Sequence, residues 1–152
     1  MDGNDTVIRP GEVVADLPEA TDAGVYFIGR IRTPWTERSA CPKRGDDEAG
    51  PECRIELDPR WQPALAGVEP GARLQVLYWM HRARRDLVVQ TPGRDQRATG
   101  TFAIRSPNRP NPVASSSVRL VAVDGCTLVV RGLDCLDGTP LIDLKPDNCP
   151  RA

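Results

Sequence analysis

The sequence has few aromatic residues, a single histidine and no long hydrophobic run. Aromatic side chains make up 5% of its 152 residues, and His81 is the one histidine. No apolar stretch approaches the roughly 20 residues that a membrane-spanning helix needs, and no basic segment followed by an apolar one marks a secretory signal. These absences predict a soluble, cytoplasmic protein without a membrane anchor.

A large net charge is also lacking. Twenty basic and 21 acidic residues leave a formal charge of −1, which argues against binding nucleic acid by overall charge. A locally basic stretch at Arg82, Arg84 and Arg85 could still hold an anionic ligand or a phosphate backbone.

The five cysteines include no CxxC pair, and with one histidine they exclude a zinc ribbon. We therefore expect no metal site. Reduced thiols are the simplest expectation for a cytosolic protein, although Cys41 and Cys53 could pair across the loop that they flank.

Fifteen prolines and 13 glycines disfavour long helices and favour short strands joined by turns. We expect a mainly β fold: a small closed or partly open β-barrel of short strands, with one short helix and long functional loops. Residues 1–24 are expected to be a poorly ordered lead-in with one short strand near Val13 and Val14, and residues 25–152 to form the barrel domain. The helix is expected to start at Pro59 and run to Val68. Strands are predicted over residues 25–32, 53–57, 73–81, 87–90, 100–105, 117–123, 127–131 and 141–144.

Residues 36–52 form a long polar segment with several chain breakers. Long irregular segments in compact domains are usually functional or mobile. This segment is the first candidate for a lid.

A second loop, Arg105 to Pro112 (RSPNRPNP), holds three prolines, two arginines and two asparagines in eight residues. Each proline fixes its own φ and restricts the residue before it, so the loop is stiff. Arginine suits carboxylate, phosphate or an adenine face, and asparagine suits purine edges. We interpret the loop as one wall of a small-molecule site.

The run Asp134 to Pro140 (DCLDGTP) is the third element. Asp137-Gly138 predicts a turn, in which Asp137 could cap its own turn or grip a donor-bearing ligand such as a ribose diol or an ammonium group. Asp134 stands among apolar neighbours, and a half-buried carboxylate needs a partner. His81 could be a structural hydrogen-bonder or a general base.

Five blocks resemble the signature blocks of the TsaA/TrmO-like S-adenosylmethionine-dependent methyltransferases. The blocks are residues 28–35, 41–44, 78–82, 100–112 and 133–146, in the family's order. The resemblance implies a barrel that binds S-adenosyl-L-methionine, often as a homodimer. It implies N6-methylation of threonylcarbamoyladenosine next to the anticodon of tRNA.

The resemblance also implies residue roles. Cofactor-binding residues are expected at Pro42, Lys43, Arg44, His81, Arg82, Arg105, Ser115, Asp134, Cys135, Leu136, Asp137, Gly138 and Thr139. A proton would be accepted by His81 or by an aspartate such as Asp137. Because basic and amide side chains cluster in the same loops, we expect substrate contacts from Arg84, Arg85, Arg97, Arg109 and Asn111.

The chain departs from the family pattern at Arg44, at Val113-Ala114-Ser115 and at its C-terminal end. Relatives commonly have glutamine at Arg44, Ile-Gly-Leu at Val113-Ala114-Ser115 and tyrosine at Asp147, and longer relatives add a C-terminal domain thought to help hold tRNA. These departures keep two alternatives open: a methyltransferase of a small molecule or another RNA, and a non-catalytic module that binds S-adenosylmethionine.

Overall fold

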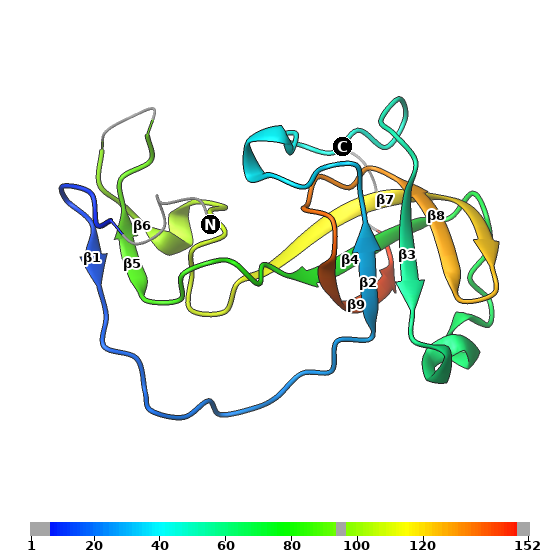
Figure 1. The fold of residues 1–152 in the computed structure, drawn as a ribbon, viewed down its shortest axis with the longest axis horizontal. Helices are drawn as coiled ribbons and strands as arrows, with labels where there is room; N and C mark the ends of the chain where they lie inside the picture. Colours follow the sequence, from blue (N-terminus) through cyan, green and yellow to red (C-terminus); the bar gives the residue numbers. More distant parts are fainter. Residues whose placement is uncertain (1–6, 94–96, 149–152) are drawn as a thin grey trace. The chain divides into compact units, whose positions relative to one another are not determined.

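The computed structural model describes residues 7–93 and 97–148, and the chain divides into two compact units (Figure 1). The barrel unit comprises Val25–Trp79 and the chain from Ala114 on. The proline-loop unit comprises the residues up to Gly24 together with Met80–Val113. The chain therefore passes from one unit to the other after Gly24, after Trp79 and after Val113.

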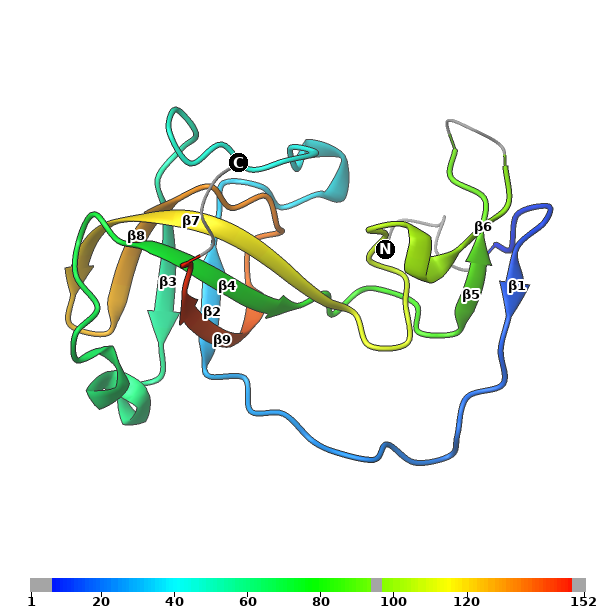
Figure 2. The ribbon, with the colours of Figure 1, turned by 180° about the vertical axis from the view of Figure 1, so that it is seen from behind.

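Six strands close the barrel, as predicted from the composition and strand pattern. Neighbouring strands pair antiparallel in the ladders β2–β3, β2–β9, β3–β8, β4–β9 and β7–β8, and Figure 2 shows β7 and β4 side by side from behind. In barrel order the strands are β2 (Gly29–Arg32), β3 (Cys53–Leu57), β8 (Thr127–Arg131), β7 (Val113–Asp124), β4 (Arg73–Trp79) and β9 (Thr139–Pro146).

Alternation along the strands builds the barrel interior. In β4 every second residue is buried, namely Leu74, Val76 and Tyr78. Side chains of a strand alternate between the two faces of its sheet, so one set fills a closed barrel. The fully buried aliphatic side chains of this core are Ile31, Ile55, Val76, Val118, Leu120, Leu128, Val130 and Leu141.

Turn chemistry explains the connections. Gly125 has a φ of 59° in the hairpin between β7 and β8, at the predicted Asp124-Gly125 turn. The predicted helix after Leu57 is the 3-10 helix η2 (Pro59–Leu65), in which the Asp58 carboxylate accepts a hydrogen bond from Arg60 N. A second 3-10 turn, η1 (Arg38–Ala40), lies between β2 and β3.

The proline-loop unit holds a three-stranded sheet in the order β1 (Val13–Val14), β5 (Leu87–Gln90) and β6 (Thr99–Gly100). The short strand predicted near Val13 is confirmed. The strand predicted over 100–105 is wrong, because the chain leaves β6 at Gly100 and turns into the 3-10 helix η3 (Thr101–Ala103). Thr101 is buried and its hydroxyl donates to Leu87 O at 2.8 Å, which pulls the chain inward at this point.

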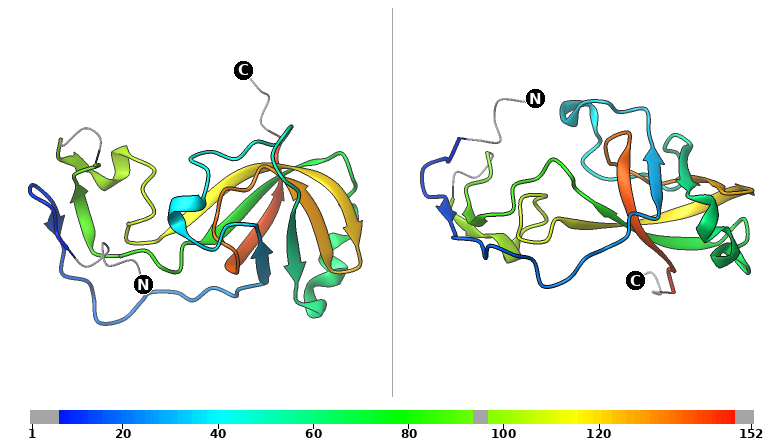
Figure 3. Two further views of the ribbon diagram at one scale, coloured as in Figure 1. Left: turned by 45° about the horizontal axis from the view of Figure 1, so that its top comes forward. Right: turned by 60° about the horizontal axis from the view of Figure 1, so that its bottom comes forward.

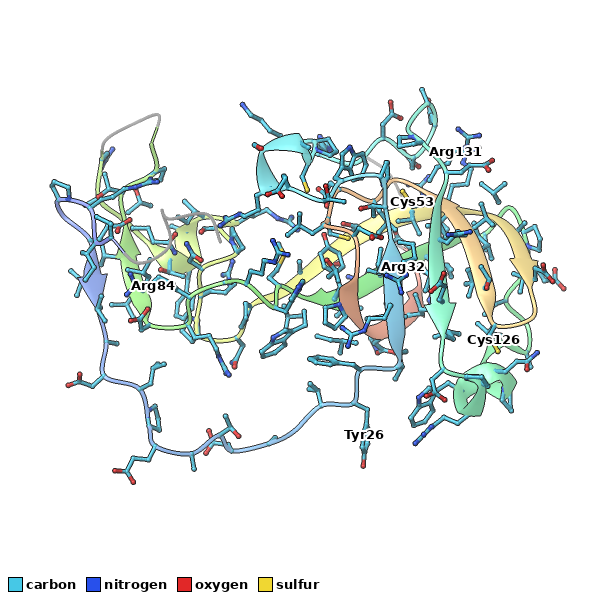
Figure 4. The ribbon with its side chains drawn as sticks, viewed as in Figure 1. Tyr26, Arg32, Cys53, Arg84, Cys126 and Arg131 are labelled. Carbon is cyan, nitrogen blue, oxygen red and sulfur yellow. The ribbon has the colours of Figure 1, made fainter. Side chains whose placement is uncertain are left out.

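Cys41, Cys53, Cys126 and Cys135 are free thiols, so the alternative of a Cys41–Cys53 disulfide is not realised; Figure 4 labels Cys53 and Cys126. Cys149 lies outside the described residues. Within residues 7–93 and 97–148, no helix combines the length and apolarity needed to cross a membrane.

Candidate functional site

A hydrogen-bonded cluster supports Asp134 in the connection between β8 and β9. The Tyr78 hydroxyl, on β4, donates to Asp134 Oδ1 at 2.9 Å. Ser116 Oγ, on β7, lies 3.0 Å from the Tyr78 hydroxyl oxygen and 3.5 Å from Asp134 Oδ1. The partner that the sequence demanded for a half-buried Asp134 is therefore this pair of hydroxyls.

Tyr78 is suited to a fixed donor role. It is 2% exposed, and burial, followed by the negative charge of Asp134, raises its pKa far above the ordinary value of a tyrosine. Because the raised pKa keeps the phenol protonated near neutral pH, Tyr78 presents an O–H to the carboxylate.

The second carboxylate of the block, Asp137, ties two loops together. Its Oδ1 accepts a hydrogen bond from Thr33 N at 3.1 Å, and its own N–H donates to Trp35 O at 2.7 Å. Asp137 therefore anchors the segment after β2 rather than capping its own turn. Gly138 follows with a φ of 79°, as the predicted Asp137-Gly138 turn requires.

The residues between the two aspartates are packed inward or bonded through their backbones. Cys135 is buried, and burial raises the pKa of its thiol to about 12. Cys135 O accepts a hydrogen bond from the Thr33 hydroxyl at 2.8 Å, and Leu136 O accepts one from the Thr139 hydroxyl at 2.6 Å. The predicted contacts Cys135, Leu136 and Thr139 thus shape a rigid block.

The segment proposed as a lid is fastened to the barrel over residues 45–52. Asp47 pairs with Arg73, and Arg131 Nη1 donates to Gly50 O at 2.9 Å. A Cβ on Gly45 would lie 1.8 Å from Gly132 O, so the two segments touch there and leave no room for a side chain. Figure 3 shows the segment, in cyan, beside the orange connection that carries Asp134.

The first part of that segment approaches the Asp134 block. Burial raises the pKa of Cys41, and the negative charge of Asp134 raises it further. The predicted contacts Pro42, Lys43 and Arg44 follow Cys41 directly, and the last two are exposed. The barrel unit thus brings the first predicted loop and the Asp134 block together.

In the proline-loop unit, Arg84 holds structure. Its guanidinium meets both oxygens of Asp86, at 2.9 and 2.8 Å, and its hydrogen bonds keep the pKa of Asp86 below the usual range. Its backbone N–H donates to Asn108 Oδ1 at 3.0 Å and its carbonyl accepts from Arg109 N at 3.0 Å. Figure 4 labels Arg84.

Two more of the predicted substrate residues brace the proline loop itself. Arg85 Nε donates to Pro110 O at 2.6 Å and its Nη2 to Asn111 Oδ1 at 3.2 Å. Arg109 Nη1 donates to Ile104 O at 3.3 Å and Ser106 O at 3.2 Å. Much of the donor capacity expected for substrate phosphates is therefore spent inside the loop, whereas Arg97 is exposed.

The predicted cofactor residues fall in both units. Ser115 is in the barrel unit, where its hydroxyl accepts from Gln75 Nε2 at 3.0 Å. His81, Arg82 and Arg105 are exposed residues of the proline-loop unit. Sequence reasoning missed Tyr78 and Ser116; the available signal was that Tyr78 shares the inward-facing parity of Leu74 and Val76 in β4.

No group of three or more histidine, cysteine, aspartate or glutamate side chains in the described part of the chain is placed to hold a metal ion. The chemistry of the site is that of carboxylates, hydroxyls and backbone amides.

The chain is similar to known proteins over most of its length. Residues 30–148 match the model of the tRNA-methyltransferase O N-terminal domain. A relative from Rhizobium radiobacter, named "Probable S-adenosyl-L-methionine-binding protein VirR", is 50% identical over 142 residues, which are 93% of this chain and 81% of that protein.

Two solved structures have the same fold. A crystal structure of TrmO is 32% identical, with a TM-score of 0.72, and covers 87% of this chain and 62% of the other. TrmO from Pseudomonas aeruginosa is 30% identical, with a TM-score of 0.68, and covers 87% of this chain and 61% of the other. This chain thus spans about three fifths of the length of those TrmO chains. On the family match and the Rhizobium relative together, the chain belongs to the family of the tRNA-methyltransferase O N-terminal domain.

Proposed function

We propose that this protein is an S-adenosyl-L-methionine-dependent methyltransferase that N6-methylates threonylcarbamoyladenosine next to the anticodon of tRNA, in the cytoplasm. The observation that best supports binding of this cofactor is the hydrogen bonding of the Asp134 carboxylate. Its Oδ1 is held by Tyr78 and Ser116, while Oδ2 accepts no hydrogen bond from the residues that the structure describes.

The residues present fit this cofactor. A half-buried carboxylate with one oxygen available suits a ligand rich in donors or positive charge. S-adenosylmethionine offers an ammonium group, ribose hydroxyls and a sulfonium, and when bound it supplies an electrophilic methyl group. The proposed contacts are those implied by the family resemblance: Pro42, Lys43, Arg44, His81, Arg82, Arg105, Ser115 and Asp134 to Thr139.

The chain's own contribution is chiefly positioning. Methyl transfer is an in-line displacement, so a rigid site that aligns donor and acceptor supplies much of the acceleration. The ties from Asp137 to Thr33 and Trp35 keep the block in one geometry. The acceptor nitrogen loses a proton, and His81 or Asp137 is proposed to receive it.

Calorimetric titration of S-adenosylmethionine into Asp137→Ala and Arg105→Ala tests the site. We expect both variants to bind more weakly than wild type, and wild-type affinity in both would overturn the site. Arg60→Ala is the matched control for Arg105→Ala, because Arg60 is an exposed arginine of η2 that pairs with Asp58, two residues before it.

Labelled cofactor, incubated with total tRNA from a strain that lacks the modification, tests the acceptor. Label in threonylcarbamoyladenosine supports the proposal. Label in another nucleoside or in a small molecule supports the first alternative, a different acceptor. Tight binding without transfer supports the second, a cofactor-binding module, which is favoured by the naming of the Rhizobium relative as a binding protein.

We also propose that the protein is a homodimer. The proline-loop unit exposes apolar side chains that water solvates poorly, including Phe102, which is 84% exposed, and Val13 and Leu17, which are about half exposed. Sedimentation velocity should show a dimer at micromolar concentration. A Phe102→Asp variant should shift it toward monomer, and a monomeric wild type would contradict the proposal.

A further inference from the structure

The cluster at Asp134 contains two residues that no cofactor role has been assigned to. Tyr78 lies near the end of β4 and Ser116 lies on β7, and these strands are neighbours in the closed barrel. Strands of a closed barrel are fixed by ladders on both sides. The two hydroxyls therefore belong to the stiff wall of the barrel, while Asp134 belongs to a connection.

That connection is itself anchored on both sides of Asp134. Leu133 is 2% exposed and Cys135 is 5% exposed, so the backbone around the carboxylate is pinned by buried neighbours. The remaining freedom is rotation of the Asp134 side chain. The hydrogen bond from Tyr78 restricts this rotation, because the bond holds Oδ1 at 2.9 Å from the hydroxyl oxygen.

The pair also has a defined direction of donation. Tyr78 has one hydroxyl proton and gives it to Asp134, so Ser116 gives its own proton to the Tyr78 oxygen or to Asp134. Tyr78 thus acts on Oδ1 directly, and Ser116 acts on it either directly or through the Tyr78 oxygen. The carboxylate keeps Oδ2 for another donor.

We propose that Tyr78, assisted by Ser116, is a positioning residue that holds the Asp134 carboxylate in the orientation in which Oδ2 meets a donor or cationic group of the cofactor. This inference rests on the proposed binding of S-adenosylmethionine. It adds a supporting layer to the site: a residue from the barrel interior that orients a contact residue without touching the ligand. Such supporting hydrogen bonds are worth roughly 10- to 100-fold in affinity in metal sites.

Calorimetry with S-adenosylmethionine on Tyr78→Phe, Asp134→Asn and the double variant tests the proposal. Tyr78→Phe keeps the ring and removes only the hydroxyl, so we expect about tenfold weaker binding. In the Asp134→Asn background the same change should have less than about a twofold effect, because the group that it positions has changed. Ser116→Ala should weaken binding less than Tyr78→Phe, since its contact with Asp134 is the longer one at 3.5 Å.

Tyr26→Phe is the matched control. It is the other tyrosine of the chain, it is 79% exposed, and Figure 4 shows it on the segment before β2. It should bind the cofactor like wild type. Thermal unfolding of every variant separates lost folding from lost positioning, and a crystal structure of Tyr78→Phe should show the Asp134 carboxylate turned from its wild-type orientation.

The outcomes separate the two claims. If wild type and Asp134→Asn differ but Tyr78→Phe binds within about twofold of wild type, the positioning role is overturned and the proposed function stands. If Tyr78→Phe weakens binding equally with and without Asp134, Tyr78 is merely structural. If wild type binds no S-adenosylmethionine, the proposed function falls and the positioning role falls with it.

Discussion

Different interactions stabilise the interior of the barrel unit and that of the proline-loop unit. The barrel interior is lined by aliphatic side chains, eight of which lie on strands and have no exposed surface. In the described part of the proline-loop unit, the buried side chains are Leu87, Gln90, Thr101 and Pro112. This unit is organised by hydrogen bonds from side chains to its own backbone.

Gln90 shows how that organisation works. Its Nε2 donates to Thr101 Oγ1 at 2.9 Å and to Asn108 O at 2.6 Å, which joins β5 to η3 and to the proline loop. Burial of an aliphatic side chain contributes about 1.5–3 kcal/mol, whereas a typical hydrogen bond contributes a net of about 0.5–1.5 kcal/mol. The comparison indicates that the barrel contributes most of the free energy of unfolding. The proline-loop unit has a defined shape but a smaller free energy of local unfolding.

The largest effect is expected from Leu120→Ala in the barrel. Leu120 is fully buried on β7, and its truncation leaves a cavity that should cost about 2–5 kcal/mol in the free energy of unfolding. Urea unfolding measures it. Val121→Ala, next along the strand and 36% exposed, is the control and should cost much less. Equal costs would mean that the barrel interior is not the stability core.

A smaller and more local effect is expected from Gln90→Leu. The change leaves Thr101 and Asn108 without their donor inside the unit, at a cost of about 1–3 kcal/mol. Hydrogen exchange should therefore speed up over residues 80–113 while barrel amides keep their protection. Val88→Ala, an exposed neighbour on β5, should leave both regions unchanged. Faster exchange throughout the barrel would contradict the division between the two units.

The smallest effect is a pH dependence in the alkaline range, which is expected of the barrel unit because the sequence of the proline-loop unit has neither cysteine nor tyrosine. Burial raises the pKa of Cys135 from 9.0 to about 12. At a pH below the pKa of the thiol in the unfolded chain, the folded and the unfolded protein both keep the thiol proton. Between the two values the unfolded state loses it first, so the unfolding free energy should fall by up to about 1.4 kcal/mol per pH unit.

Urea unfolding at about pH 8 and about pH 10 measures this slope. Cys135→Ala should flatten it, and the part due to Tyr78, whose pKa is also raised, should persist. Cys126→Ala, at a half-buried thiol in the hairpin between β7 and β8, is the control. An unchanged slope in Cys135→Ala would show that this thiol does not titrate differently in the two states.

The sequence was sufficient for features that depend on local pattern. Alternation in β4, the Asp124-Gly125 hairpin and the Asp137-Gly138 turn follow from side-chain parity and from the positive φ that glycine allows. The need of Asp134 for a partner followed from its apolar neighbours. Such arguments use residues that are adjacent in the chain, which is why they need no three-dimensional information.

Features that depend on distant partners were beyond the sequence. The strand predicted at Thr101 failed because a hydrogen bond to Leu87, 14 residues away, outweighed the strand pattern. Gln90 lies in a predicted strand, but its hydrogen bonds to Thr101 and Asn108, 11 and 18 residues away, follow only from the fold. Tyr78 meets Asp134 across 56 residues, a pairing set by barrel closure.

The contact between Met80 and Pro112 has a consequence for how the fold tolerates change. Met80 N donates to Pro112 O at 2.8 Å, just after β4 ends and just before β7 begins. The chain therefore leaves β4 and returns to its neighbour β7 at two points that are joined by a hydrogen bond. A segment whose two ends already meet adds little strain to its host, so its length and sequence can vary while the strands on either side stay paired. Insertions or deletions between Met80 and Pro112, in the stretch that carries His81, Arg82 and Arg105, should therefore cost the pairing of β4 and β7 little.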